Sequence, residues 1–479
     1  MKNNLAKTGL ILGPIVFIAL LLLLPGDMAW PARAVAATSG LMATWWITEA
    51  IAIPATAMLP IVLFPLMGVM NGSSVTLHYA NHLVYLFLGG FLIGMAIEKS
   101  NLHHRIALNT VRLTGLGPAR VVLGFMLSSA FLSMWISNTA SAMIMFTIAM
   151  AFLAQVKESA AQMGTEVPAQ FGTGLMLAIA YSCSVGGIST LVGTPSNAVL
   201  VGVFETTFGT SINFVDWMLL ATPLALVMLL LVWIFLVRIR FHCGEWKLPV
   251  SSDWLDRELA SLGQMTTAEK RTMAVSLFVI SLWLIRGFSD WAIWSSVQDS
   301  TISILGALLL FLIPSGEGRG SNLLDWQSAK SIPWDVLLLF GGGFALAAGF
   351  VESGLVAWLA ESLTFLSGLN PWFVLVSIVA LVIFLTELTS NTATAAMLLP
   401  VTVSVAAAMG AEPLGFMIAA TLASSFAFMM PVATPPNAIV YSSRMVSIGQ
   451  MAGAGIWLNI LGLLLISVYV VFAAPLLLG

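Results

Sequence analysis

Apolar residues dominate this chain in long runs, and short polar segments separate the runs. A membrane-spanning helix needs about 20 mostly apolar residues, and runs close to this length recur from residue 10 to residue 475. Most of them lack the strict alternation of apolar and polar positions that marks the strands of a membrane barrel. The pattern therefore predicts an all-α integral membrane protein.

The first half of the chain predicts one N-terminal span and then a block of helices. The N-terminal span lies within residues 1–34, and the block covers 35–241. Proline ends a helix because it lacks a backbone donor, and Gly with Pro inside a membrane segment marks a broken helix. The predicted elements of the block are two spans within 35–70 that meet near Ala52–Pro54, a span at about 82–98, a half-polar interfacial segment, a re-entrant hairpin at about 120–156, a broken helix at about 171–206 and a span at about 216–237.

The stretch from Arg120 to Gln155 is interpreted as a re-entrant hairpin rather than as one crossing. It is about 35 residues long, whereas one crossing needs about 20. Charged residues flank it on both sides, with Arg120 before it and Lys157 and Glu158 after it. A hairpin that enters and leaves on the same side keeps both flanks in water and places the polar centre of the stretch deep in the membrane.

The second half of the chain repeats this plan. Residues 242–270 are the most polar part of the chain and predict a cytoplasmic linker, and Thr266 and Glu269 near its end have the spacing of a capping box that opens the next helix. The block 271–479 follows. Its predicted elements are spans at about 272–287, 298–313 and 334–351, an interfacial segment at 352–368, a re-entrant hairpin at about 371–407, a broken helix at about 412–445 and a last span at about 451–475.

A short polar motif lies at the centre of each predicted hairpin. Trp135–Ala142 reads WISNTASA, and Leu388–Ala395 reads LTSNTATA. The two copies are 253 residues apart, and Gly89–Phe91 returns at the same offset as Gly342–Phe344. A shared offset over this distance indicates two related halves, each with one Ser-Asn-Thr tip.

Positive charges give a consistent orientation when both hairpins are re-entrant. With the N-terminus in the cytoplasm, the chain crosses the membrane about eleven times, and the positive-inside rule is obeyed because only Arg33 and Arg286 fall outside. The C-terminus then lies outside. Each half has an odd number of crossings, so the halves are predicted to form an inverted repeat whose two tips approach the midplane from opposite faces.

Composition narrows the classes of function. The chain has 479 residues, of which 59% are hydrophobic and 8% are charged, whereas soluble domains carry about 25% charged residues. A net charge of −3 gives no basis for a nucleic-acid partner, and Cys183 and Cys243 lack the spacing of a metal site. No His-Glu-x-x-His or Gly-x-Ser-x-Gly motif occurs, so the chain is not predicted to be an enzyme.

Two polar tips and two broken helices that meet in the membrane suit small ions. Half-helix N-termini offer free N–H groups and positive dipole ends to an anion such as a carboxylate. Freed backbone carbonyls suit a small hard cation such as Na⁺. Neither tip nor either break contains Lys or Arg, so a bound anion needs another neutralising charge. Na⁺ bound beside the anion supplies it, which is the physical basis of symport.

The motifs resemble those of the divalent anion/Na⁺ symporter family. They are the paired Ser-Asn-Thr tips, the Thr-Pro-x-Asn sequences at Thr194 and Thr434, and the Trp-Trp-x-Thr-Glu sequence that ends at Glu49. The resemblance covers nearly the whole chain. It implies a dimeric elevator-type carrier of dicarboxylates, citrate or sulfate in a plasma membrane, which is the inner membrane of a bacterium, with Na⁺ as coupling ion and no organic cofactor.

The resemblance also implies which residues bind the ions. A first Na⁺ site is expected from Ser133, Ser137, Asn138 and Gly193, and a second from Thr386, Thr389, Asn391 and Ala433. Substrate carboxylates are expected at Ser137, Asn138, Thr139, Ser390, Asn391 and Thr392, in a cavity also lined by Thr194, Pro195, Thr434 and Pro435.

Within the resemblance, intact Ser-Asn-Thr motifs at both tips favour a C4-dicarboxylate such as succinate over citrate or sulfate. The predicted function is therefore Na⁺-coupled symport of a di- or tricarboxylate. A Na⁺-independent dicarboxylate exchanger and a carrier of another oxyanion, sulfate or arsenite, remain alternatives. Glu387, three residues before Ser390, is either a structural acid that is hydrogen-bonded within its hairpin or a coupling acid.

Overall fold

The computed structural model describes residues 2–115, 117–243, 246, 248, 253–289, 291–316, 318 and 321–472. Helices dominate this part of the chain, and the described residues contain no β-strand beyond one isolated bridge between Pro314 and Asn322. Eight of the described helices are long and apolar enough to cross a membrane, and five shorter apolar helices accompany them. The prediction of an all-α integral membrane protein is confirmed, while the number of crossings stays a prediction.

The first seven helices precede the first Ser-Asn-Thr tip. Pro31 stands in the first turn of the second helix, where proline is favoured because the missing N–H has no partner there. Asn71 and Asn81 cap two of the others by accepting a hydrogen bond from a backbone N–H of the first turn. The helices are α1 (Lys2–Leu23), α2 (Trp30–Thr48), α3 (Ile53–Thr56), α4 (Leu59–Leu66), α5 (Gly72–Tyr79), α6 (His82–Lys99) and α7 (Leu102–Thr114).

Two predictions for this region need correction. The boundary predicted after residue 34 falls inside α2, which begins at Trp30. The second span predicted within 35–70 is not a continuous helix, because the prolines at 54, 60 and 65 divide it into the short helices α3 and α4.

Each half contains two pairs of helices where a hairpin and a broken helix are predicted, and the re-entrant path of the hairpins stays a prediction. In the first half they are α8 (Pro118–Ser133) with α9 (Asn138–Gln162), and α10 (Ala169–Gly187) with α11 (Pro195–Phe208), followed by α12 (Phe214–Ile234) and a π-helical turn at Phe235–Arg240. In the second half they are α19 (Pro371–Thr386) with α20 (Asn391–Met409), and α21 (Pro413–Ser424) with α22 (Pro435–Ser442), followed by α23 (Ile448–Phe472). The predicted end of the last span at 475 lies outside the described residues.

The remaining helices lie between these groups. They are α13 (Asp253–Ser261), α14 (Thr267–Phe288), α15 (Asp299–Leu312), α16 (Trp326–Ala329), α17 (Trp334–Glu352) and α18 (Leu355–Ser362), with 3₁₀ turns at Ala292–Ser295 and Thr364–Gly368. The predicted capping box is confirmed. The hydroxyl of Thr266 accepts from the N–H of Glu269 at 3.1 Å, and Glu269 Oε2 accepts from the N–H of Thr266 at 2.7 Å.

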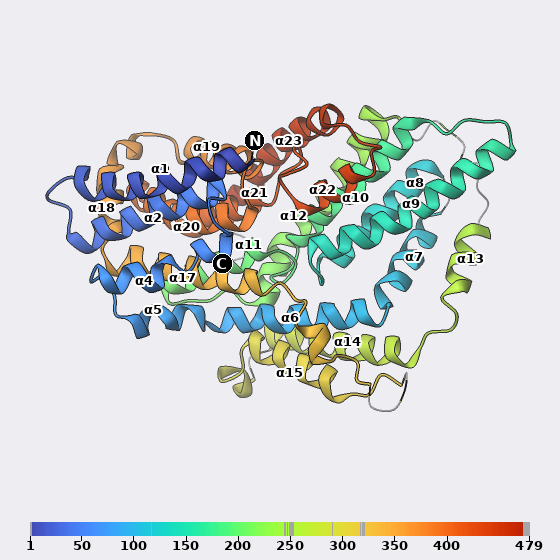
Figure 1. Ribbon diagram of the computed structural model, residues 1–479, viewed down its shortest axis with the longest axis horizontal. Helices are drawn as coiled ribbons and strands as arrows, with labels where there is room; N and C mark the ends of the chain where they lie inside the picture. Colours follow the sequence, from blue (N-terminus) through green and yellow to red (C-terminus); the bar gives the residue numbers. More distant parts are fainter. Residues whose placement is uncertain are drawn as a thin grey trace.

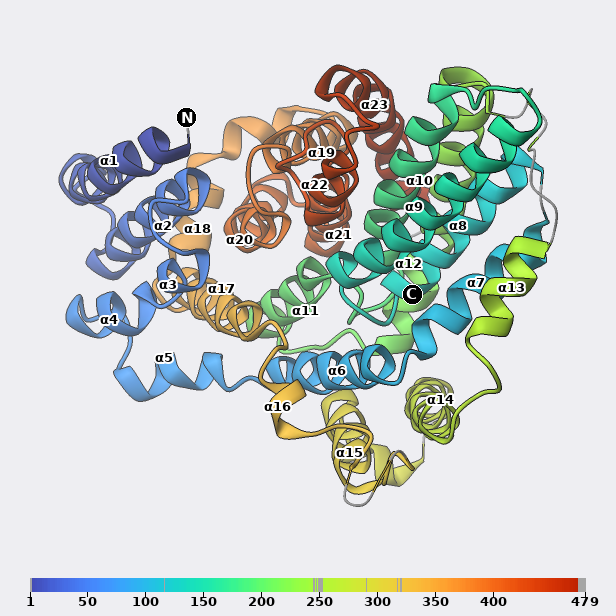
Figure 2. The ribbon, with the colours of Figure 1, turned by 45° about the vertical axis from the view of Figure 1, so that its right-hand side comes forward.

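Figures 1 and 2 show the helices from two directions, and we divide most of them into two groups. We call α8–α12 with α19–α23 the central group and α1–α6 with α14, α15 and α17 the flanking group. Within the central group, α10 packs on α8, α9 and α22, while α21 packs on α19, α20 and α23. The helix α11 joins the groups, because it packs on α20 and also on α17.

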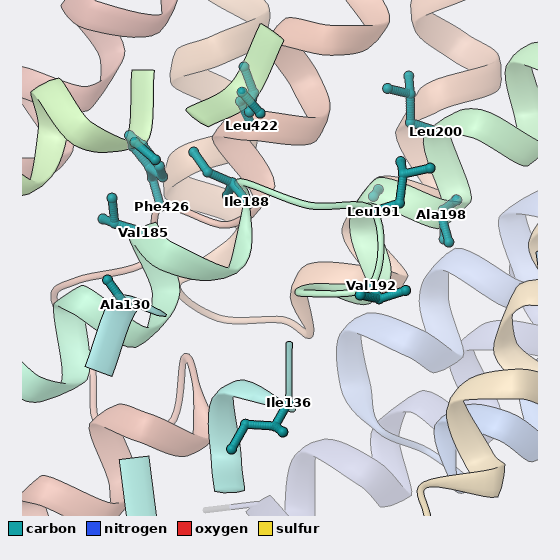
Figure 3. Close-up of a cluster of buried hydrophobic side chains, with 14 of the residues drawn as sticks. Ala130, Ile136, Val185, Ile188, Leu191, Val192, Ala198, Leu200, Leu422 and Phe426 are labelled. Carbon is teal, nitrogen blue, oxygen red and sulfur yellow. The ribbon is translucent and has the colours of Figure 1, made fainter. Parts of the chain in front are cut away.

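A continuous apolar core packs against both helix breaks. Val185 and Ile188 at the end of α10 belong to the same buried cluster as Leu422 and Phe426 at the end of α21 (Figure 3). Ile136 at the first tip is 5% exposed and belongs to it too. Apolar packing therefore supports the first tip and both breaks.

Candidate functional site

The first tip joins α8 to α9 through residues 134–137. Ser137 caps α9, and its hydroxyl accepts a hydrogen bond from the N–H of Ala140 at 3.2 Å. A helix leaves its first N–H groups without intrahelical partners. Asn138, Thr139 and Ala140 line one cavity of the described protein, so the positive end of α9 lies at this cavity.

Oxygen atoms surround the terminal amide of Asn138. Ser133 Oγ donates to the carbonyl of Cys183 at 2.7 Å and lies against the Asn138 amide. The carbonyls of Gly193 and Cys183 lie 3.3 Å from the same amide when its nitrogen faces them. The end of α8, the helix α10 and the first helix break thus each contribute an oxygen atom around this one amide.

The second tip has the same construction. Thr386 Oγ1 lies 2.7 Å from Asn391 Oδ1 and 2.8 Å from the carbonyl of Ser424. One hydroxyl proton cannot fully satisfy two acceptors, so this cluster is rich in oxygen and poor in protons. Ser390 caps α20 without a side-chain capping bond. Its hydroxyl is therefore not held by the helix, unlike that of Ser137.

An asparagine holds each helix break in shape. Asn197 Nδ2 donates to the carbonyl of Thr190 at 2.7 Å, and Asn437 Nδ2 donates to the carbonyl of Met430 at 3.0 Å. Both asparagines are fully buried. The Thr-Pro-x-Asn motifs contain both residues, but the resemblance of these motifs gives the two asparagines no role. Their position two residues after Pro195 and Pro435 is the signal that would have revealed it.

The two tips and the two breaks meet at one cavity of about 1090 Å³. This cavity brings together residues from both halves of the chain. The predicted site residues that line it are Ser137, Asn138, Thr139, Gly193, Thr194, Pro195, Thr389, Ser390, Asn391, Thr392, Ala433 and Pro435.

Three predicted site residues lie behind the cavity wall. Ser133 and Thr386 are fully buried, and each contacts a tip asparagine through its hydroxyl. Thr434 is 5% exposed, and its hydroxyl accepts from the N–H of Asn437 at 3.3 Å. Ser133 and Thr386 can therefore reach a cation from behind the tips, whereas Thr434 caps α22.

The flanking group closes the other side of the cavity. Its contributions include Glu49 at the end of α2, Glu98 near the end of α6 and Asp335 in the first turn of α17. Among the described residues that line the cavity, none is Lys, Arg or His. The described lining of the cavity therefore supplies no full positive charge to an anion bound at the tips.

Glu387 is the first residue of the second tip, directly after α19, but its partners are not in its own hairpin. Its carboxylate accepts from the backbone N–H groups of Phe428, Met429 and Met430 and from the side chain of Asn459. These residues belong to the second break and to α23. The interpretation as an acid bonded within the hairpin is therefore wrong about its partners.

A family model for the sodium:sulfate symporter transmembrane region matches residues 4–478. The chain belongs to this family. Membership of the sodium:sulfate symporter family agrees with the divalent anion/Na⁺ symporter resemblance of the motifs. It also identifies the protein as a membrane transporter.

Curated relatives of this family cover almost the entire chain. The sodium-dependent dicarboxylate transporter SdcS of Staphylococcus saprophyticus is 42% identical over 476 residues, which are 98% of this chain and 92% of that protein. The protein of the same name in Staphylococcus aureus is 41% identical over the same shares of both chains.

Two solved structures share the fold of this family member at low sequence identity. The MtrF structure of Neisseria gonorrhoeae, described as illuminating a class of antimetabolite efflux pumps, has a TM-score of 0.59 at 13% identity and covers 94% of this chain and 96% of that one. The YdaH transporter of Alcanivorax borkumensis has a TM-score of 0.56 at 13% identity and covers 86% of this chain and 88% of that one. At this identity the likeness concerns the fold alone.

Proposed function

We propose that this protein is a secondary transporter that couples Na⁺ to the uptake of a C4-dicarboxylate such as succinate. The observation that carries the proposal is the convergence of two oxygen-rich tips on one cavity that has no basic residue among its described lining. The printed names of the relatives, sodium-dependent dicarboxylate transporters, support both the ion and the substrate class.

Each tip provides a donor set that fits Na⁺. Hard cations of this kind prefer neutral hydroxyl, amide and carbonyl oxygens or carboxylates. At the second tip, Thr386 Oγ1, Asn391 Oδ1 and the carbonyl of Ser424 gather around a single hydroxyl proton. At the first tip, Ser133 Oγ and the carbonyls of Cys183 and Gly193 surround the amide of Asn138. Ser137, Thr389 and Ala433 complete the two proposed ligand sets.

The substrate binds between the tips in this proposal. The N-terminal turns of α9 and α20 both lie at the cavity, and helix N-termini favour carboxylates. Two such sites facing one cavity suit a ligand with two carboxylates. The hydroxyls of Thr139, Ser390 and Thr392 add neutral donors, and Thr194, Pro195, Thr434 and Pro435 complete the surroundings.

The geometry supports alternating access. The cavity runs from the tips to Leu5, Glu49, Glu98 and Asp335, and the predicted orientation places all four at the cytoplasmic ends of their helices. The conformation is therefore proposed to face inward. In the proposed elevator mechanism, the central group moves against the flanking group. The central group contains the two re-entrant hairpins of the inverted repeat. The protein is proposed to be a homodimer in the inner membrane.

Uptake of radiolabelled succinate into proteoliposomes tests the proposal. An inward Na⁺ gradient is expected to drive accumulation that collapses when K⁺ replaces Na⁺. Equal uptake without Na⁺ that depends on internal dicarboxylate would instead identify an exchanger. Competition with citrate, α-ketoglutarate, sulfate and arsenite ranks the substrates, and sulfate or arsenite outcompeting succinate would overturn the dicarboxylate assignment.

A further inference from the structure

The carboxylate of Glu387 occupies a position that the proposed transport cycle does not yet explain. It is 3% exposed and does not line the cavity. Its Oε1 accepts from the N–H of Phe428 at 2.7 Å and from the N–H of Met429 at 2.9 Å. Asn459 Nδ2 donates to the same oxygen at 2.8 Å. Such a set of donors satisfies a buried carboxylate in its charged form.

The other oxygen of this carboxylate leads directly to a proposed Na⁺ ligand. Glu387 Oε2 accepts from the N–H of Met430 at 3.0 Å. The carbonyl of Met430 accepts from the N–H of Ala433 at 3.2 Å and from Asn437 Nδ2 at 3.0 Å. The position of Ala433, whose carbonyl is proposed to bind the second Na⁺, thus depends on Met430 and through it on Glu387.

The first half joins the same two positions by different chemistry. Met134 lies 253 residues before Glu387, the offset of the tips, and Thr190 lies 240 residues before Met430, the offset of the break asparagines. Thr190 Oγ1 donates to the carbonyl of Met134 at 2.6 Å. Both halves therefore have a hydrogen bond between the hairpin and the break. In the first half the acceptor is a backbone carbonyl, and in the second half it is a charged carboxylate.

The length of the second break explains why an acid is needed there. α10 continues to Gly187, so the first break covers residues 188–194, whereas α21 ends at Ser424 and the second break covers 425–434. The longer break leaves more backbone N–H groups without a helical acceptor. The carboxylate of Glu387 accepts three of them.

We propose that Glu387 is the positioning residue of the second Na⁺ site. It fixes the second break against the second hairpin, and its negative charge behind the tip strengthens cation binding at that site alone. The two Na⁺ sites are consequently unequal. This inference rests on the proposed function, because it assigns a role to Glu387 in the same Na⁺-coupled cycle.

The test compares Glu387→Gln with Glu387→Asp in the purified full-length protein. Glu387→Gln is expected to raise the Na⁺ concentration for half-maximal succinate uptake at least tenfold, while the KM for succinate at saturating Na⁺ stays within twofold. Glu387→Asp keeps the charge, and its Na⁺ concentration for half-maximal uptake is expected to lie within threefold of the wild-type value. The exposed acid before α21 provides the control, since Glu412→Gln is expected to change neither quantity.

A binding measurement keeps the test independent of transport. Na⁺ alone is expected to raise the thermal midpoint of the wild type, and Glu387→Gln is expected to lose most of this rise. If Glu387→Gln does not fold, Asn459→Ala tests the inference instead, because it removes one hydrogen-bond donor to the Glu387 carboxylate. It is expected to raise the Na⁺ concentration for half-maximal uptake two- to fivefold.

Specific results overturn the inference. The inference is refuted if Glu387→Gln responds to Na⁺ like the wild type. If Glu387→Gln does not fold, a wild-type Na⁺ response in Asn459→Ala refutes it. Equal losses of Na⁺ and succinate affinity in Glu387→Gln and Glu387→Asp would do so as well, because they indicate a merely structural role. Wild-type protein that shows neither Na⁺-dependent uptake nor Na⁺-dependent stabilisation refutes the proposed function itself, which is a distinguishable result.

Discussion

A single methyl group at Gly187 should disturb the first tip without touching the second. A Cβ atom added to Gly187, the last residue of α10, would lie 2.5 Å from an amide atom of Asn138 and 3.1 Å from the carbonyl of Gly193. Ordinary contacts need about 3.4 Å or more, so the amide has to move by almost 1 Å. Ser133 and the surrounding carbonyls leave it little room.

The expected cost follows from packing energetics. Overpacking a close-packed interior by one methyl group costs about 1–3 kcal/mol. If the added methyl group destabilises only the Na⁺-bound state by this amount, Gly187→Ala raises the Na⁺ concentration for half-maximal uptake by roughly 5- to 150-fold. Succinate uptake measured against external Na⁺ in proteoliposomes provides the value.

A matched glycine separates a local effect from a general one. Gly415 lies in α21, where an added Cβ would meet only Val470 at 3.6 Å, an ordinary contact. Gly415→Ala is therefore expected to leave Na⁺ activation unchanged. A wild-type Na⁺ response in Gly187→Ala would refute the assignment of the first cation site to the Asn138 amide.

Three further predictions concern the tips and the cytoplasmic surface. Asn138→Ala and Asn391→Ala should each abolish succinate uptake while the protein still inserts, as measured by uptake and by size-exclusion chromatography; normal uptake by either would remove the site assignment. Burial lowers the pKa of His103 in α7 to about 4. The unfolded value is about 6.5, so acidification from about pH 6.5 to 4 should destabilise the fold by up to about 3 kcal/mol, and in thermal melts His103→Asn should lose this dependence. The Lys99 ammonium holds the pKa of Asp325 at about 2. This pair is solvent-exposed, so Asp325→Asn should cost less than about 1 kcal/mol, seen as a small change of thermal midpoint; a large change would indicate a buried role.

The doubled motifs made the centre of the protein predictable. Ser-Asn-Thr at 137–139 and 390–392 predicted two helix pairs with polar tips, and the structure starts α9 at Asn138 and α20 at Asn391. The Thr-Pro motifs predicted the breaks, because proline begins a helix but cannot continue one. α11 and α22 begin at Pro195 and Pro435.

Other features could not be predicted, because they depend on contacts between distant segments. The apolar pattern within 35–70 does not reveal how three prolines divide it into α3 and α4. The partners of Glu387 lie 41 to 72 residues away, and no local spacing indicates them. The sequence predicts that an acid lies at membrane depth, but only the folded chain shows which donors it accepts from.

The same physical reasoning explains how the proposed coupling arises. The described lining of the cavity contains Glu49, Glu98 and Asp335 but no basic side chain. A dicarboxylate that enters alone is therefore repelled by these like charges, and only the positive ends of two helix dipoles attract it. Opposite charges about 4 Å apart attract by about 4 kcal/mol at an effective dielectric constant of about 20, which is close to a thousandfold in affinity. Na⁺ bound at the tips would contribute an attraction of this size, and a cation without the anion would lack it. Tight binding then requires both ions together, and a cavity with its own Lys or Arg would bind the anion without Na⁺ and lose the coupling.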